Sequence, residues 1–252
     1  MKRIGLIGGM SHESTAHYYS GINKLINEKL GGLSSADMLL RSVNFAVYSD
    51  MMKSGSWNLI KDMIMDEISS LANSCELIAI ATNTMHKVAG DIQFDQMILP
   101  PTFVHIGDAV ADKCKALGVK RVLLLGTKFT MTEDFMKNRL RDNDLEVVDK
   151  YSDEFIDRLD HIIFDELCRG IVSLESRKYI LLLLKDCLEK MSSLGPPVDG
   201  IVLGCTELDM ILDDYAADYL QCQLIDSTQA HIEKIVEMAL DDDDLEIEID
   251  LS

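Results

Sequence analysis

The fold expected for this chain is indicated most clearly by the stretch Ile201-Val202-Leu203-Gly204-Cys205-Thr206-Glu207-Leu208. Its apolar, β-branched run stops at a glycine and is followed by a cysteine, a threonine and a carboxylate. Residues 209–219 then carry apolar side chains at helical spacing. A strand, a glycine turn and a helix in this order project a side chain into the crevice at the carboxyl end of a parallel sheet. The pattern therefore predicts a parallel α/β fold with Cys205 at the ligand-binding edge of a sheet.

Two interpretations of Cys205 are open. Beside a helix N-terminus the pKa of a thiol falls, so thiolate becomes available near neutral pH. Most free cysteines, in contrast, are small buried hydrophobes. The reactive interpretation gains support because the same design occurs a second time in the chain.

An internal repeat runs through the sequence. Residues 2–9 (KRIGLIGG) match residues 120–127 (KRVLLLGT), and residues 76–83 (ELIAIATN) match residues 199–206 (DGIVLGCT). Such self-similarity predicts two related α/β units, and it makes Thr82 the counterpart of Cys205. We expect a first domain of residues 1–100 plus 224–252 and a second of 101–223, because Pro100 and Pro101 break the pattern. The last helix, over 227–240, is expected to pack back onto the first domain.

Composition excludes several classes of function. The chain has 252 residues, of which 47% are hydrophobic and 27% charged, as in a soluble globular protein. Its net charge of −19 argues against nucleic acid or an anionic membrane as the main partner. Six cysteines without a CxxC pair indicate a reducing compartment. No signal peptide or membrane span is recognisable, so a cytoplasmic location is expected. The acidic stretch 241–250 predicts a solvated extension or a late edge strand.

Other motifs narrow the chemistry. The turn at residues 8–11 is not a GxGxxG, which argues against dinucleotide binding. The six histidines show no ligand spacing such as HExxH, so no metal is predicted. Residues 82–87 (TNTMHK) are rich in hydrogen-bond donors where a helix should begin, which suits either a carboxylate site or an ordinary helix cap. Residues 126–132 form a second hydroxyl-rich turn.

Five motifs together resemble the aspartate/glutamate racemase superfamily over nearly the whole chain. They are IGLIGGMS (4–11), SVNF (42–45), NTMHK (83–87), LGT (125–127) and GCTE (204–207). The resemblance implies two pseudo-symmetric α/β domains with parallel central sheets and the active site in the cleft between them. It also implies an amino-acid or dicarboxylate substrate, no pyridoxal phosphate or other cofactor, and a homodimer.

The resemblance further implies a racemisation mechanism. In two-base members of the superfamily two cysteines flank the substrate Cα, and Thr82 occupies the position of the first. The chain is similar to a subgroup of bacterial racemases with a single cysteine and a preference for L-aspartate and L-glutamate. Cys205 would then act as thiolate base on the L-isomer. Thr82 would at most donate a proton, because the pKa of a hydroxyl lies far above that of a thiol.

By the same resemblance, several residues are candidates for substrate contacts. Thr84, Thr127 and Thr206 would hold the α-carboxylate, and Asn83 would bind the ammonium or a carboxylate. Arg158 stands where relatives have a lysine for the distal carboxylate. The pocket would be lined by Met10 and by Met52, the latter at a position where those relatives have glutamine.

Two other functions fit the same residues. Decarboxylases of the superfamily, of malonate type, use one cysteine to protonate a single face of an enediolate. A binding or sensor protein would have kept the cleft and lost turnover. Retention of Cys205 and Glu207 argues against complete loss of catalysis.

Overall fold

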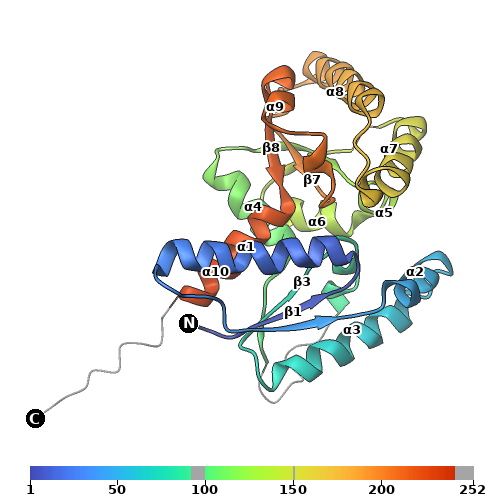
Figure 1. Cartoon of the computed structure of the whole chain (residues 1–252). Coiled ribbons are helices and arrows are strands. Elements are labelled where there is room, and N and C mark those ends of the chain that lie inside the picture. Colours follow the sequence, from blue (N-terminus) through green and yellow to red (C-terminus); the bar gives the residue numbers. More distant parts are fainter. Residues whose placement is uncertain (92–99, 150, 242–252) are drawn as a thin grey trace, which may run out of the picture. The chain divides into compact units, whose positions relative to one another are not determined.

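The computed structural model describes residues 1–91, 100–149 and 151–241. Within these residues the chain forms two four-stranded parallel sheets, with strand orders β2-β1-β3-β4 and β6-β5-β7-β8 (Figure 1). The predicted α/β class with parallel sheets is therefore confirmed. The described residues form two compact units, each with most of its contacts between residues of the same unit. The first comprises residues 1–81, 91, 100–104 and 232–241, and the second comprises residues 82–90, 105–149 and 151–231.

Helices cover both faces of the first sheet. Alternation along β1 turns Ile4 and Leu6 toward one face, where they pack with α1 and with the second half of α10. The other face is covered by α3, whose buried isoleucines recur at helical spacing (Figure 1). The elements of this unit are β1 (Ile4–Gly8), α1 (His12–Leu30), β2 (Met38–Ser42), α2 (Phe45–Lys53), α3 (Trp57–Ala72), β3 (Leu77–Ile80) and β4 (Thr102–Phe103).

The second sheet is covered in the same way. Val122 and Leu124 face α4 and α6, whereas Leu123 and Leu125 face α7, α8 and α9. The strands are β5 (Arg121–Leu125), β6 (Glu146–Val148), β7 (Gly200–Leu203) and β8 (Gln223–Asp226). The helices are α4 (Ile106–Ala116), α5 (Lys128–Thr132), α6 (Asp134–Asp142), α7 (Asp153–Asp165), α8 (Leu174–Leu194), α9 (Asp214–Leu220) and α10 (Ser227–Leu240), and the 3-10 turns are η1 (Thr84–Lys87), η2 (Ala89–Asp91), η4 (Leu167–Arg169) and η5 (Leu208–Met210).

The sequence repeat corresponds to equivalent contacts in the two sheets. Arg3 pairs with Asp37 at 2.8 Å, and its counterpart Arg121 pairs with Glu146 at 2.8 Å. The strand ends match as well. The N–H of Ala81 donates to the carbonyl of Ile7 at 2.8 Å, and the N–H of Gly204 donates to that of Leu125 at 2.6 Å. Thr82 directly follows Ala81, and Cys205 directly follows Gly204. The two residues therefore occupy equivalent positions after the ends of β3 and β7.

Two expected elements differ from the structure. The sequence of residues 38–45 predicts one strand that continues to Phe45, but β2 ends at Ser42, because Asn44 accepts a hydrogen bond from the N–H of Ala46 at 3.2 Å and caps α2. The helix predicted over 209–219 begins only at Asp214, where the carboxylate of Asp213 accepts from the N–H of Ala216 at 3.1 Å. Only the short turn η5 precedes it.

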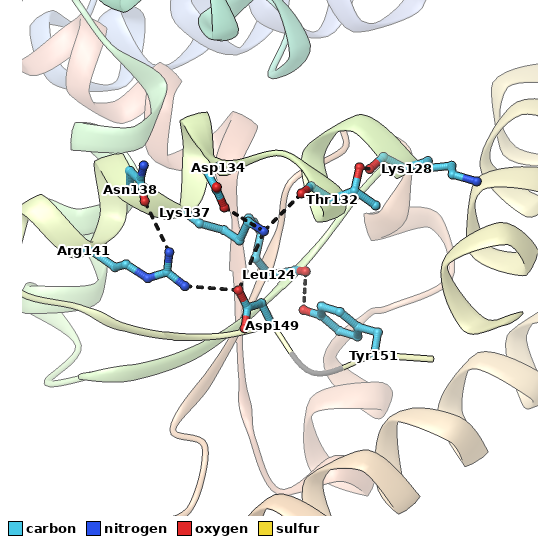
Figure 2. Close-up of polar contacts among 9 residues, drawn as sticks. All are labelled: Leu124, Lys128, Thr132, Asp134, Lys137, Asn138, Arg141, Asp149 and Tyr151. Carbon is cyan, nitrogen blue, oxygen red and sulfur yellow. Dashed lines mark hydrogen bonds and ion pairs between the residues drawn. The ribbon is translucent and has the colours of Figure 1, made fainter. Parts of the chain in front are cut away.

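A network of ionic contacts fixes the segment that follows β5. Lys137 is almost fully buried, and its Nζ lies 3.2 Å from Asp134 Oδ1, 3.7 Å from Asp149 Oδ2 and 3.4 Å from the carbonyl of Thr132 (Figure 2). A buried ammonium requires such acceptors, because desolvation otherwise disfavours its charge. The Tyr151 hydroxyl donates to the carbonyl of Leu124 at 2.5 Å, beyond the end of β6 (Figure 2). The end of β5 and the turn after it are thereby held in place.

The last strand and helix connect the two units along the chain. β8 pairs with β7 of the second sheet, whereas the sequence-based division assigned residues from 224 onward to the first domain. Ala230 packs in the core of the second unit, and residues Ile232, Ile235 and Val236 pack in that of the first. The side chains of α10 therefore change from one core to the other between Ala230 and Ile232. The acidic stretch from residue 242 lies outside the described residues, and no described helix has the length and apolar character needed to cross a membrane.

Candidate active site

In the turn after β7, the thiol of Cys205 contacts the carboxylate of Glu207. Cys205 is buried, and its Sγ donates a hydrogen bond to Glu207 Oε2 at 3.0 Å. The hydroxyl of Thr206 donates to the same oxygen at 2.6 Å. Burial, followed by the negative charge of Glu207, raises the pKa of Cys205 well above its ordinary value. The resting group is therefore a thiol whose proton is directed at a carboxylate.

The expectation that a helix N-terminus lowers the pKa of Cys205 is wrong. Cys205 is followed by the three-residue turn η5, and the next α-helix starts at Asp214. A single 3-10 turn has few aligned peptide dipoles, so its field is weak. Burial and the carboxylate of Glu207 act in the opposite direction and decide the sign of the shift.

A second thiol is affected by the same carboxylate. Burial of the Cys168 thiol, followed by the charge of Glu207, raises its pKa to about 12, although Cys168 as a whole residue of η4 is exposed. Cys205 and Thr206 therefore both donate to Glu207, and the charge of Glu207 also acts on the thiol of Cys168. Glu207 belongs to the GCTE motif and follows the cysteine by two positions, but the sequence does not indicate that it accepts the thiol proton. No local pattern indicates Cys168, which comes from a different segment.

Thr82 begins the segment that carries the TNTMHK motif. Its carbonyl oxygen accepts from His86 Nδ1 at 2.8 Å, and His86 Nε2 accepts from the N–H of Ile106 at 3.2 Å. Because Nε2 accepts, the imidazole proton is on Nδ1. Burial and the neighbouring His105 lower the pKa of His86 well below its ordinary value. His86 thus binds the backbone of Thr82 as a neutral ring, and no hydrogen bond among the described residues involves the Thr82 hydroxyl.

Asn83 connects this segment to the strand that carries Cys205. Its Nδ2 donates to the Ser227 hydroxyl at 3.1 Å, and that hydroxyl donates to the carbonyl of Leu203 at 2.7 Å. Leu203 is the last residue of β7, two positions before Cys205. Asn83 is buried, and its Oδ1 has no hydrogen-bond partner in the described part of the chain. The structure therefore links Asn83 to the Cys205 strand and leaves one buried acceptor unsatisfied.

The Thr127 turn lies beside the Cys205 turn. Leu125 and Leu203 are paired in the sheet, and a Cβ built on Gly126 would lie 3.0 Å from the carbonyl oxygen of Gly204. Thr127 is buried, with its hydroxyl 3.3 Å from that of Thr130. Two of the predicted hydroxyl-bearing residues, Thr127 and Thr206, thus stand at neighbouring strand ends. A third, Thr84, is half-buried in η1.

The remaining predicted contacts are located as follows. Arg158 lies on α7 with its guanidinium carbon 5.7 Å from the ring centre of Tyr179, and none of the described carboxylates forms an ion pair with it. The described contacts do not join Arg158 to the Cys205 turn. Met10 is buried after β1, and Met52 is half-buried on α2, both in the first unit. Their part in substrate binding stays a prediction. No group of three or more His, Cys, Asp or Glu side chains is arranged to hold a metal within the described residues.

Comparison with known proteins gives one family. The family described as Asp/Glu/Hydantoin racemase matches residues 7–235. A candidate Asp/Glu racemase from Yersinia pestis is similar at 36% identity and a TM-score of 0.83, over 95% of this chain and 100% of that one. An aspartate racemase homologue from Pyrococcus horikoshii OT3 has 34% identity and a TM-score of 0.79, over 95% and 99% of the two chains. An aspartate racemase from Picrophilus torridus, at 21% identity and a TM-score of 0.66 over 95% and 94%, shares the fold.

Proposed function

Because the chain belongs to the Asp/Glu/Hydantoin racemase family, we propose that it is a cofactor-independent isomerase that racemises aspartate, glutamate or both. The family match and the relatives at 36% and 34% identity support this reaction class. The preference for L-isomers is proposed from the asymmetry between Cys205 and Thr82, which follow equivalent strands with unequal acid–base groups. This asymmetry also underlies our assignment to the single-cysteine subgroup.

The contact between Cys205 and Glu207 is the observation that carries the proposal. A thiol with a raised pKa becomes a base only if a neighbouring group takes its proton. Glu207 already accepts the S–H at 3.0 Å, so proton transfer along this hydrogen bond would give the thiolate. The thiolate would then remove the α-proton of the L-amino acid, and the substrate would keep the electron pair as an enolate-like carbanion.

Reprotonation on the opposite face completes the racemisation. We assign this step to a water molecule whose proton passes through the Thr82 hydroxyl, because no hydrogen bond joins that hydroxyl to a base among the described residues. The hydroxide that remains takes up, through solvent, the proton held on Glu207, and this restores the resting state. His86 does not serve as that base, since its Nδ1 proton binds the Thr82 carbonyl. Because the two enantiomers have equal free energy, kcat/KM for racemisation must be the same in both directions. The asymmetry is therefore expected in solvent exchange of the α-proton, which should be faster from the L-isomer, where Cys205 acts, than from the D-isomer, where Thr82 would have to act.

The contacts of the described side chains suggest how the substrate is held. The unsatisfied Oδ1 of Asn83 accepts hydrogen bonds, so we assign it to the substrate ammonium rather than to a carboxylate. Arg158 is proposed for the distal carboxylate, because its guanidinium has no described acidic partner. Thr84 and Thr127 are proposed for the α-carboxylate. The hydroxyl of Thr206 already donates to Glu207 and is proposed to hold that carboxylate in place.

Chiral chromatography tests the proposal. The full chain is incubated with L-aspartate or L-glutamate, and the opposite enantiomer is measured over time beside Cys205→Ala. We expect D-isomer from at least one substrate and none above background from the variant. No D-isomer from either substrate would overturn the proposal.

One observation favours a second function, single-face decarboxylation of a substituted malonate. Cys205 is the one thiol at the two equivalent strand ends, and a decarboxylase needs to protonate only one face. Incubation with phenylmalonate and detection of phenylacetate tests this alternative. The expected homodimer is likewise a proposal, which multi-angle light scattering tests directly.

A further inference from the structure

Ser227 is a buried hydroxyl outside every motif that indicated the site. It is the first residue of α10 and is fully buried. Its Oγ donates to the carbonyl of Leu203 at 2.7 Å and lies 3.1 Å from Asn83 Nδ2. The side chain therefore lies between the end of β7, which precedes Cys205, and the segment that begins at Thr82. Asn83, in that segment, is 144 positions from Ser227 in the sequence.

These two contacts determine which way the Asn83 amide faces. A serine hydroxyl has one proton, and a carbonyl oxygen can only accept. The Ser227 proton is therefore directed to Leu203, so Ser227 must accept from Asn83. Only the amino end of the amide can donate, and this places Oδ1 on the other side. The orientation of the amide follows from the network of hydrogen bonds.

The other end of the Asn83 amide is an unsatisfied acceptor. Asn83 is 5% exposed, and its Oδ1 has no partner among the described residues. An unpaired buried acceptor is unfavourable unless a donor comes to meet it. An ammonium group is such a donor, and a carboxylate is not.

We propose that Ser227 is a positioning residue that acts through Asn83. By accepting from the amide nitrogen it holds Oδ1 in the orientation that receives the substrate ammonium. It also ties the Thr82 segment to the strand that carries Cys205. This inference rests on the proposed racemase function, because it assigns the ammonium of an amino acid as the group recognised.

The test compares ligands with and without an ammonium. Ser227→Ala is assayed for L-aspartate turnover and for inhibition by succinate, which keeps both carboxylates and lacks the ammonium. Loss of one hydrogen bond to a charged group predicts a KM for L-aspartate raised about 10-fold, with the inhibition constant of succinate unchanged within about 2-fold. Thr228→Val is the matched control, since Thr228 is the next residue, is buried, and has a hydroxyl with no partner in the described part of the chain.

Two further variants separate positioning from folding. Ser227→Thr and Ser227→Val have nearly the same volume and differ in the hydroxyl, so only Thr should restore the KM. In an Asn83→Ala background, Ser227→Ala should have no further effect on the KM, because Ser227 acts through that amide. Equal weakening of L-aspartate and succinate, or equal behaviour of Thr and Val, would overturn the inference. Absence of turnover in the unmodified chain would instead overturn the proposed function.

Discussion

Glu207 Oε2 accepts the thiol proton of Cys205 across 3.0 Å, within a turn that both residues share. From the sequence, Cys205 was expected to be a thiolate without the help of another side chain. The contact suggests that Glu207 generates the thiolate. In the proposed mechanism the thiolate of Cys205 removes the substrate proton, and the carboxylate of Glu207 makes that thiolate available by accepting the thiol proton.

Glu207→Gln should abolish most of the turnover while the chain stays folded. The amide still fits the turn but cannot take the proton, and loss of a general base lowers rates by about 100- to 10,000-fold. Removing the negative charge also removes one cause of the raised pKa of Cys205. The residual rate should therefore rise steeply with pH, as hydroxide replaces the carboxylate. Initial rates between pH 6 and pH 10 check this, and an unchanged rate at pH 7 would contradict it.

Thr82→Cys should make the rates of α-proton exchange from L- and D-aspartate more alike. A thiol at this position is far more acidic than a hydroxyl, so it can remove the α-proton of the D-isomer. We expect exchange from D-aspartate to increase about 10-fold or more. Each unit by which the pKa of the side chain at position 82 falls makes its ionised form tenfold more abundant. Thr82→Ser is the control and should leave the preference for the L-isomer intact. The same ratio of L to D exchange in all three proteins would refute the assigned role of Thr82.

Acid should destabilise the second unit through its buried histidines. Burial, then Arg139 and His231, lowers the pKa of His105 from 6.5 to about 3. The unfolded chain therefore binds a proton that the folded chain excludes. The contribution of such a histidine to the free energy of unfolding is fully present above about pH 6.5. Below that pH the free energy of unfolding falls by about 1.4 kcal/mol per pH unit for each histidine. Urea unfolding at pH 7, 6, 5 and 4 measures this slope.

His105→Asn provides the control for that slope. His105 Nδ1 accepts from the N–H of Gly107 at 3.0 Å and caps α4, and asparagine can accept there without titrating. The variant should retain its stability at pH 7 and lose less of it by pH 4. An identical pH dependence in the two proteins would exclude His105 as a cause.

Gly204→Ala should destabilise the chain because the two strand ends lie very close together. A Cβ at this position would lie 2.7 Å from the carbonyl oxygen of Leu125 and 3.0 Å from Thr130 Cγ2. Such overpacking costs about 1–3 kcal/mol. Gly90→Ala is the matched control, as a Cβ there meets nothing within 4 Å. Thermal unfolding of the two variants gives the comparison, and equal melting temperatures would show that the close approach is relaxed in solution.

The sequence predicted the sheets well, because strand periodicity and the repeat are properties of neighbouring residues. Arg3 and Arg121 occupy matching positions and make matching ion pairs. The late start of α9 and the early end of β2 were missed, since the helix caps Asp213 and Asn44 override the apolar periodicity within a few residues. Site contacts between distant segments were also beyond prediction. Asn83 and Ser227 are 144 positions apart, and only the folded chain brings them together.

The measurement that tests the central claim most directly is proton NMR of L- and D-aspartate and of L- and D-glutamate incubated with the chain in D₂O. Cys205→Ala is measured in parallel. We expect loss of the α-proton signal from at least one L-isomer, faster than from its D-isomer, and no loss above background in the variant. Equal exchange in Cys205→Ala, or no exchange from any of the four amino acids, would contradict the assignment of Cys205 as the base.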